Sequence, residues 1–406
     1  MDTPEAADTK MELTPRSEIE NRLARLQGKL AAADDAEAVF ILNAPDMFYF
    51  TGTAQDAWLV IGRSGPPLML VRRSLERARA ESPLEHILPL ENPREIPGLL
   101  VSHGLGGLRR VGLEFDVLPV EQYARVGRLF PTMQLVDASR MIREVRMIKS
   151  AYEVARVRKA AVIQDHMARK LCEVLKPGMT ELELAAEVEA EARRHGHQGI
   201  IRTRRFNLHC FYGHLLSGEN GAVPSFLDSP TGGTGTSPAF GNGPGMRRIQ
   251  PHEPILLDYA GAHDGYHSDQ ARLFSLGTLP EDLVAGYRAC LDILEEVMAA
   301  LRPGASANDV FARAAALAGR LGYADRFMNA GSAQVGFVGH GVGVELDEIP
   351  YLGAGPNLTI QASMTLAVEP KIVFPDRGIV GVEDTILVTS GDPEYLTFTP
   401  RELVIL

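Results

Sequence analysis

The sequence of 406 residues has few of the features that mark several classes of protein. It holds only three cysteines, Cys172, Cys210 and Cys290, and their wide spacing argues against a disulfide framework or a cysteine-based zinc site. No apolar run reaches the length of a membrane span. The first 20 residues lack the basic and then apolar pattern of a signal peptide. We therefore expect a cytoplasmic protein with no membrane partner.

Positive charge is also scarce. The chain has 41 Lys and Arg against 52 Asp and Glu, which gives a formal net charge of −11. Such an acidic protein is a poor binder of nucleic acid, whose phosphates repel it, so we expect no nucleic-acid partner. Hydrophobic residues make up 45% and charged residues 23%, as in ordinary globular proteins. The length exceeds that of one usual core and predicts two domains.

The first third of the chain alternates between short apolar runs and helical patterns. Residues 1–15 are small and polar without a period, which predicts a disordered tail. Residues 17–30 place apolar side chains at helical spacing. Further apolar runs predict strands at 38–42, 58–61, 68–71 and 111–114, and helices are predicted at 74–81 and 120–129. This alternation predicts a small α/β domain over residues 16–142.

The remainder, residues 143–406, repeats one order of elements. A predicted helix over 151–175 ends at Pro177-Gly178, and a second begins after Thr180 with Glu183 placed for a capping box. The same order returns with helices over 281–301 and 306–321, separated by Pro303-Gly304. After each pair comes a predicted hairpin with two acidic residues. We interpret this as a duplicated α+β unit whose two halves enclose one site.

The first hairpin carries Asp258 and Asp269 on either side of an Asp264-Gly265 turn signal. A turn centred on residues 263 and 264 sets the two aspartates directly opposite each other. A turn on 264 and 265 sets them diagonally. Because side chains alternate along a strand, both registers place them on one face. Two facing carboxylates repel each other unless a cation lies between them.

The second hairpin repeats this arrangement with Glu369 and Glu383, which are equidistant from Asp376. Pro370 leaves the register open, because proline requires a strand edge or a bulge. The segment Gly339-His340-Gly341 adds an imidazole between residues that let the backbone approach closely. Four carboxylates and one histidine suit two divalent ions, such as Mn²⁺, Co²⁺, Fe²⁺ or Zn²⁺. Two such ions activate a water for attack and polarise a carbonyl.

The five residues, in this order and spacing, closely resemble the M24 metallopeptidases, which include methionine aminopeptidases, Xaa-Pro aminopeptidases, prolidases and creatinases. Residues 142–153 resemble the start of the family's catalytic domain, and residues 43–52 resemble the N-terminal domain of prolidases and creatinases. The resemblance implies an α+β protein. Its C-terminal catalytic domain would have the pita-bread fold with an internal pseudo-twofold repeat, preceded by a smaller α/β creatinase-like domain.

The resemblance also implies roles for the residues. Asp258 and Asp269 would bind one or both metals, His340 would bind one, and Glu383 would bridge them. Glu369 would bind one metal and act as proton shuttle or general base for the attacking water. The activity implied is that of a dinuclear metal-dependent hydrolase of the Xaa-Pro dipeptidase or aminopeptidase type, acting on a small peptide. The family also implies a homodimer.

Two departures from the family pattern leave a second interpretation open. No histidine follows Ser217-Gly-Glu-Asn220 closely, and Asp347 stands seven residues after His340, where peptidase members usually carry histidine. His209 or His214 is a candidate to replace a missing histidine. Alternatively, the chain is a metal-dependent lyase or hydrolase of a small molecule that uses Asp347 as catalytic base. A third reading, a non-catalytic binding protein, ranks last because every metal-ligand position is kept.

Overall fold

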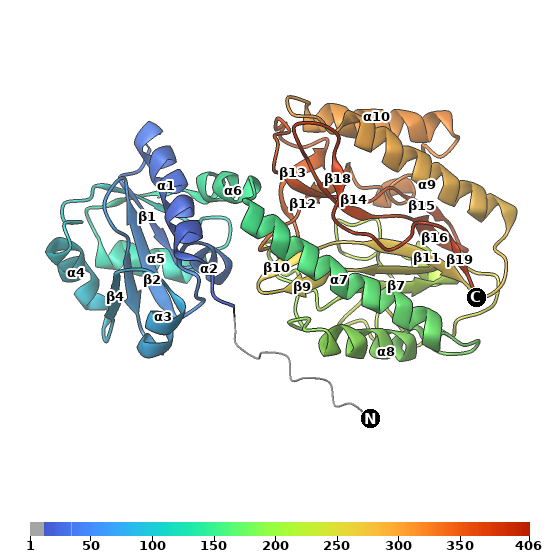
Figure 1. The fold of residues 1–406 in the computed structure, drawn as a ribbon, viewed down its shortest axis with the longest axis horizontal. Helices are drawn as coiled ribbons and strands as arrows, with labels where there is room; N and C mark the ends of the chain where they lie inside the picture. The colour runs from blue at the N-terminus through green and yellow to red at the C-terminus, as the bar shows by residue number, and fades with distance from the viewer. Residues whose placement is uncertain (1–11, 34) are drawn as a thin grey trace. The chain divides into compact units, whose positions relative to one another are not determined.

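The computed structural model describes residues 12–33 and 35–406, so the predicted tail over residues 1–15 lies outside it except for its last four residues. The chain divides into two compact units, Met1–Val145 and Arg146–Leu406. Both contain strands and helices (Figure 1). Within the described residues, no helix combines the length and the apolar character that crossing a membrane requires.

The first unit is built on a six-stranded sheet with the order β4-β3-β2-β1-β5-β6. The β1, β2 and β3 strands pair antiparallel, whereas β3/β4, β1/β5 and β5/β6 pair parallel. The predicted runs form the four central strands, and β4 and β6 are edge strands whose partly exposed residues gave no apolar run. The strands are β1 (Ala38–Ile41), β2 (Ala57–Gly62), β3 (Leu68–Val71), β4 (His86–Pro89), β5 (Arg110–Leu113) and β6 (Gln134–Asp137).

The helices of this unit pack apolar side chains against the sheet. The predicted stripe on α1, from Ile19 to Leu30, is buried. The predicted helices 74–81 and 120–129 appear as α3 and α5 with bounds within one residue. The helices are α1 (Arg16–Ala32), α2 (Ala44–Thr51), α3 (Leu75–Glu81), η1 (Pro93–Glu95), α4 (Ile96–Ser102) and α5 (Val120–Leu129), followed by α6 (Ser139–Met147) at the boundary of the two units.

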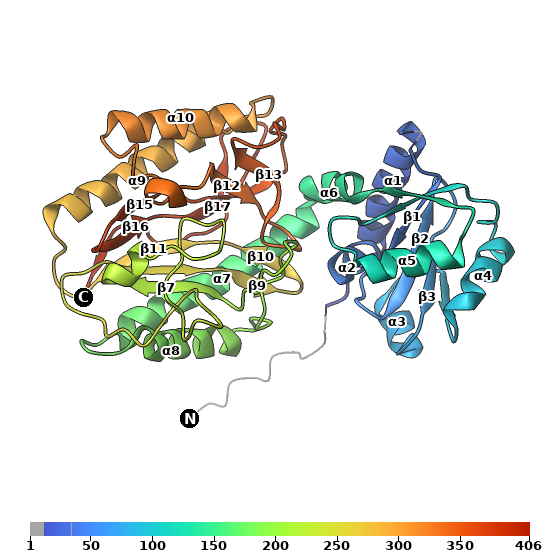
Figure 2. The same ribbon diagram turned by 180° about the vertical axis from the view of Figure 1, so that it is seen from behind.

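The second unit places its strands between two helix pairs, as Figures 1 and 2 both show. The predicted pairs are present: α7 (Ala151–Val174) with α8 (Glu181–Arg194), and α9 (Glu281–Ala300) with α10 (Ala307–Arg320). Thr180 and Glu183 form the predicted capping box, and Ser306 caps α10. The order of a helix pair and an acidic hairpin therefore occurs twice in the chain. The two helix pairs lie on opposite sides of the strands.

Two larger sheets and two short hairpins form the strand layer of this unit. One sheet has the order β19-β11-β8-β7 and the other β13-β12-β14-β17-β18. The strands are β7 (Gly213–Ser217), β8 (Ile255–Tyr259), β9 (Gly261–His263), β10 (Tyr266–Ser268), β11 (Ala271–Ser275), β12 (Phe337–Gly341), β13 (Glu348–Gly353), β14 (Thr365–Val368), β15 (Lys371–Phe374), β16 (Gly378–Gly381), β17 (Asp384–Leu387), β18 (Glu394–Tyr395) and β19 (Val404–Ile405). Two short 3-10 helices, η2 (Gly218–Ala222) and η3 (Gly331–Ala333), complete the unit.

The registers of the two acidic hairpins settle what the spacing left open. In the first, Asp258 pairs with Ala271, so the turn lies at Asp264-Gly265 and Asp269 is diagonal to Asp258. In the second, the β14/β17 pairing of Val368 with Asp384 and the β15/β16 pairing of Lys371 with Gly381 belong to one register. Glu369 and Glu383 therefore face each other at the break between these ladders, where Pro370 is accommodated.

Candidate metal centre

A pocket of about 500 Å³ opens into the second unit, and all six predicted site residues line it. These residues are Asp258, Asp269, His340, Asp347, Glu369 and Glu383. Residues between Phe226 and Pro244, in the glycine-rich segment of the sequence, form part of the wall. Buried Glu181 holds this segment, because its carboxylate accepts hydrogen bonds from Ser217, Asn220 and Gly245. These hydrogen bonds hold the two ends of the segment in place at the pocket wall.

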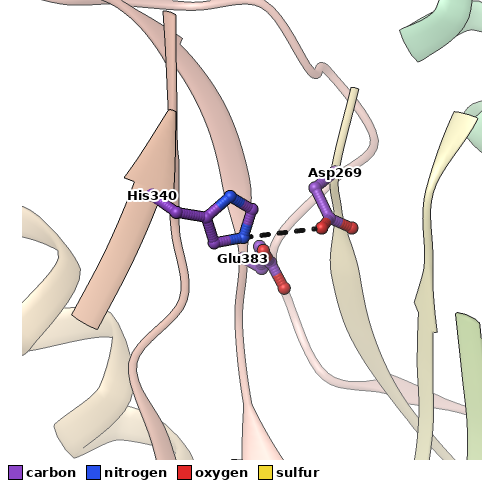
Figure 3. Close-up of side chains that lie close together, drawn as sticks. All are labelled: Asp269, His340 and Glu383. Carbon is purple, nitrogen blue, oxygen red and sulfur yellow. Dashed lines mark ion pairs between the residues drawn. The ribbon is translucent and has the colours of Figure 1, made fainter. Parts of the chain in front are cut away.

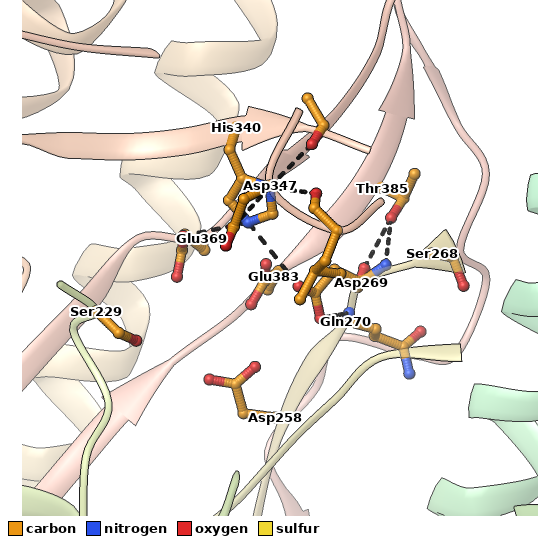
Figure 4. Close-up of polar contacts among 12 residues, drawn as sticks. Ser229, Asp258, Ser268, Asp269, Gln270, His340, Asp347, Glu369, Glu383 and Thr385 are labelled. Carbon is orange, nitrogen blue, oxygen red and sulfur yellow. Dashed lines mark hydrogen bonds and ion pairs between the residues drawn. The ribbon is translucent and has the colours of Figure 1, made fainter. Parts of the chain in front are cut away.

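Strands and the breaks between them position the acidic side chains, which Figure 4 shows together. Asp258 lies within β8, paired with residues of β7 and β11. The other three lie at strand ends, since Asp269 joins β10 to β11, Glu369 follows β14 and Glu383 precedes β17. An irregularity in a ladder can re-aim a side chain.

The two hairpins are tied to each other directly. Ala271 and Glu383 exchange backbone hydrogen bonds of 3.3 and 3.2 Å. The Thr385 hydroxyl accepts from the amide of Asp269 at 2.7 Å and donates to its carbonyl at 2.9 Å. Buried Arg272 donates to the Glu383 carbonyl at 2.7 Å and to the Asp384 carboxylate at 2.6 Å. These contacts fix the acids of one hairpin against those of the other.

His340 lies in β12, where its two glycine neighbours are required. A Cβ at Gly339 would lie 2.3 Å from the Ala367 carbonyl oxygen, and one at Gly341 would lie 2.6 Å from that of Ile349. Close approach of the backbone therefore explains the predicted glycines. The Nδ1 atom lies 3.1 Å from the carbonyl oxygens of Gly341 and Leu346. Since a carbonyl only accepts, Nδ1 carries the proton and Nε2 keeps its lone pair for a ligand.

The donors fit a divalent ion. Ligand atoms of Asp269, His340 and Glu383 all lie within 4.8 Å of one another, and all three residues are buried (Figure 3). A fourth donor is near, since Glu369 Oε1 lies 3.7 Å from His340 Nε2. Glu383 Oε1 is buried and has no hydrogen-bond partner among the described residues. A buried, unpartnered carboxylate oxygen is costly, and binding a cation would remove that cost.

The electrostatics of these side chains reflect their burial beside like charges. Burial first, and the charge of Asp258 second, raise the pKa of Asp269 to about 7. Burial and the neighbouring Asp269 raise the pKa of Glu383 well above its usual value. Burial alone would lower the pKa of His340, but Asp347, Glu369 and Asp269 outweigh it and raise that pKa. A cation among these groups would favour their deprotonated forms.

Lys371 is a charged member of the site that the sequence analysis missed. Its side chain is 1% exposed, and its Nζ lies 2.7 Å from Glu369 Oε2, 2.8 Å from Glu383 Oε2 and 3.2 Å from Asp258 Oδ2. Burial would lower the pKa of Lys371, but these three carboxylates raise it well above its usual value. A signal was present, since Lys371 follows Glu369 by two residues and alternation places both on one face.

A buried ionic network beside the segment from His340 to Glu348 was also missed. Glu348 accepts from Arg146 at 2.6 Å and from Lys149 at 2.9 Å, and Arg146 also lies 2.7 Å from Glu345. All four residues are buried. The partners are about 200 positions apart in the chain, so no local pattern in the sequence could have paired them.

The remaining predicted residues have different surroundings. Asp347 Oδ1 lies 3.8 Å from His340 Nδ1, and its side chain is 20% exposed in the pocket. His214 faces Asp258 across β7 and β8, and its Nδ1 lies 2.8 Å from the Thr231 hydroxyl. Burial, the largest effect, lowers the pKa of His214. His209 also lines the pocket but is exposed. Of the two candidates for the missing histidine, His214 is thus the one held in place beside the acids.

Comparison with known proteins agrees with this geometry. The profile "Metallopeptidase family M24" matches residues 155–390, and "Creatinase/Prolidase N-terminal domain" matches residues 22–148. The probable dipeptidase PepE of Mycobacterium tuberculosis is 26% identical over 394 residues, covering 94% of this chain and 96% of that protein. The Xaa-Pro dipeptidase of Pyrococcus horikoshii is 25% identical over 370 residues, 91% of this chain and 94% of that protein.

Solved structures match over nearly the full length. A dipeptidase from Pyrococcus horikoshii has a TM-score of 0.78 at 28% identity and covers 95% of this chain and 100% of that one. The Xaa-Pro dipeptidase from Bacillus anthracis has a TM-score of 0.81 at 22% identity, covers 96% of this chain and 100% of that one, and supports the fold. With more than half of its length matched by the family profile, the chain belongs to metallopeptidase family M24 and carries a creatinase/prolidase N-terminal domain.

Proposed function

We propose that this protein is a metal-dependent hydrolase of Xaa-Pro dipeptides or longer Xaa-Pro peptides. The observation that carries the proposal is the group of close, buried donors Asp269, His340 and Glu383, with Glu369 3.7 Å from His340, in a pocket that Asp258 also lines. The sequence predicts two divalent ions, drawn from Mn²⁺, Co²⁺, Fe²⁺ and Zn²⁺, and carboxylate and imidazole donors suit each of these metals. The names of the relatives described above support a peptide substrate.

The residues of the chain divide the work as follows. A divalent ion held among these donors would supply Lewis acidity to the attacking water and the peptide carbonyl. Glu369, whose Oε1 lies 3.7 Å from His340 Nε2, accepts the proton of the water and passes it to the leaving amine. His214, which lines the pocket beside Asp258, would contact the substrate. Phe226 and Phe240, both exposed and lining the pocket, cover its apolar groups.

Turnover of purified protein on a panel of peptides tests this function. After reconstitution with Mn²⁺, we expect release of a free amino acid from Xaa-Pro dipeptides or from longer Xaa-Pro peptides, and loss of this activity in chelator. Matched Xaa-Ala peptides serve as the control for the proline requirement. Metal binding without cleavage of any peptide would contradict the proposal.

The alternative function, a lyase or hydrolase of a small molecule, depends on Asp347. We favour the peptidase, because the relatives carry peptidase names. Asp347 contacts His340 at Nδ1, at 3.8 Å, whereas Asp269 and Glu369 contact His340 Nε2.

The Asp347→Ala variant separates the two functions. We expect a peptidase to lose only part of its activity, about 10- to 100-fold, because Asp347 acts through the charge and orientation of His340. Complete loss in a variant that keeps its metal content would instead favour Asp347 as the catalytic base. The measurement is kcat/KM on the best Xaa-Pro peptide, beside the exposed-residue control Asp325→Ala.

Two further expectations from the sequence are kept as proposals. We propose a cytoplasmic location, which the acidic composition and the scarcity of cysteine support. We also propose a homodimer, which the family resemblance supports. Light scattering of the purified chain at several concentrations measures its molar mass and tests the second point.

A further inference from the structure

Lys371 brings a fixed positive charge into the group of proposed metal ligands. Its ammonium contacts three of the four carboxylates, Asp258, Glu369 and Glu383, at 2.7 to 3.2 Å. Gly381 lies opposite Lys371 in the hairpin, and its lack of a side chain leaves room for the aliphatic part of the lysine. A Cβ at Gly381 would lie 2.5 Å from the Lys371 Cγ. The lysine side chain is therefore held in this place by the packing around it.

In each of the two glutamates, one carboxylate oxygen contacts Lys371 and the other does not. Glu369 gives Oε2 to Lys371 and turns Oε1 toward His340 Nε2. Glu383 gives Oε2 to Lys371 and leaves Oε1 without a hydrogen-bond partner among the described residues. The site thus has two ends. One holds Lys371 with Asp258, and the other gathers Asp269, His340 and the free oxygens of the two glutamates.

The charges of the site agree with this division. Four carboxylates balance two divalent ions. With the Lys371 ammonium present, one divalent ion leaves a net charge of −1 and two would leave +1. The ammonium therefore removes the need for a second ion that four carboxylates alone would have. An ammonium already hydrogen-bonded at 2.7 to 3.2 Å also occupies the oxygens that a second ion would need at ~2.0–2.2 Å.

We propose that the Lys371 ammonium takes the place of the second divalent ion, so that this chain holds one tightly bound ion at the end formed by Asp269, His340, Glu369 and Glu383. The inference rests on the proposed function only for the identity of the metal ligands. Asp258 then pairs with Lys371, and the centre is mononuclear.

Counting bound Mn²⁺ tests the inference without any measure of turnover. Metal-free full-length protein is equilibrated with Mn²⁺ and dialysed, its metal content is measured by atomic emission, and its electron paramagnetic resonance spectrum is recorded. For the unaltered chain we expect about one Mn²⁺ and the spectrum of an isolated ion. For Lys371→Met and Lys371→Gln we expect about two and the spectrum of a coupled pair. Lys149→Met, which removes a buried, ion-paired lysine outside the ligand set, should stay at one.

A pair of aspartate variants keeps the test decisive where the lysine variants fail to fold. Asp258→Asn should keep about one ion, whereas Asp269→Asn should lose it. Two tightly bound ions in the unaltered chain would overturn the inference and leave the proposed hydrolase standing. A folded Lys371→Met protein that still binds one ion, or equal loss in both aspartate variants, would also overturn it. A chain that binds no Mn²⁺ would overturn the metal centre itself, and with it the proposed function.

Discussion

The Glu369→Gln variant should lose hydrolysis of Xaa-Pro peptides by a factor of about 10² to 10⁴, the usual contribution of a positioned general base. Glutamine has the shape of glutamate but cannot accept the proton of the attacking water. The backbone of residue 369 is held independently of its side chain, since its amide donates to the Val338 carbonyl at 3.0 Å. We therefore expect the fold to survive the change.

The measurement is kcat/KM of the variant, with its metal content and circular dichroism spectrum. Glu187→Gln, an exposed glutamate on α8, is the matched control and should leave all three unchanged. Activity within about threefold of the original would show that the proton acceptor lies elsewhere. A variant that had lost its metal would indicate that Glu369 serves mainly as a ligand.

The second large effect is expected on stability. Glu348→Gln removes the carboxylate that Arg146 and Lys149 share in the buried network. Loss of one partner leaves the others buried and incompletely compensated, which typically lowers the free energy of unfolding by about 3–5 kcal/mol. The measurement is denaturant-induced unfolding of the full chain. Glu76→Gln breaks an exposed pair with Arg79 and, as control, should cost less than about 1 kcal/mol.

The pH dependence of this effect has a definite sign. Burial alone would raise the pKa of Glu348, but Arg146 and Lys149 outweigh it and hold the pKa at about 2. A carboxyl with a folded-state pKa below its unfolded value, ~4.3, stabilises the protein above that value. The contribution is lost as the pH falls from about 4 toward 2. Unfolding curves of the Glu348→Gln variant should therefore converge with those of the original chain at acid pH. A constant difference over this range would contradict the assignment.

Much of the site follows from spacing along the chain. Equal distances from Asp376 suggested that Glu369 faces Glu383, and the single register through both ladders of that hairpin places them so despite Pro370. The sequence of the first hairpin allowed two turn positions, and the structure chose between them. Asp264 and Gly265 both have the positive φ that such a turn requires. The central strands of the first sheet were predictable because each is a short apolar run. The edge strands β4 and β6 are partly exposed and contain no such run.

Other parts of the site depend on contacts between distant segments. Nothing near Glu348 in the sequence identifies Arg146 and Lys149 as its partners. The pocket wall between Phe226 and Pro244 has no hydrophobic period. Its shape depends on hydrogen bonds such as those of Thr231 with His214 and of Thr234 with Asn220. Lys371 was within reach of the alternation rule, but a lysine beside acids is usually read as a solvated surface residue.

The join between the two hairpins has a consequence for biosynthesis. Asp258 and Asp269 precede the other donors in the chain by about 70 to 125 residues, and the segment that locks Asp269, at Thr385, is made after every donor. The β11 strand, in the earlier half, also pairs with β19, which lies at residues 404 and 405 near the end of the chain. A nascent chain therefore cannot capture an ion while its first half alone has been translated. Metal loading of the proposed centre thus belongs to the interval after residue 385 has left the ribosome.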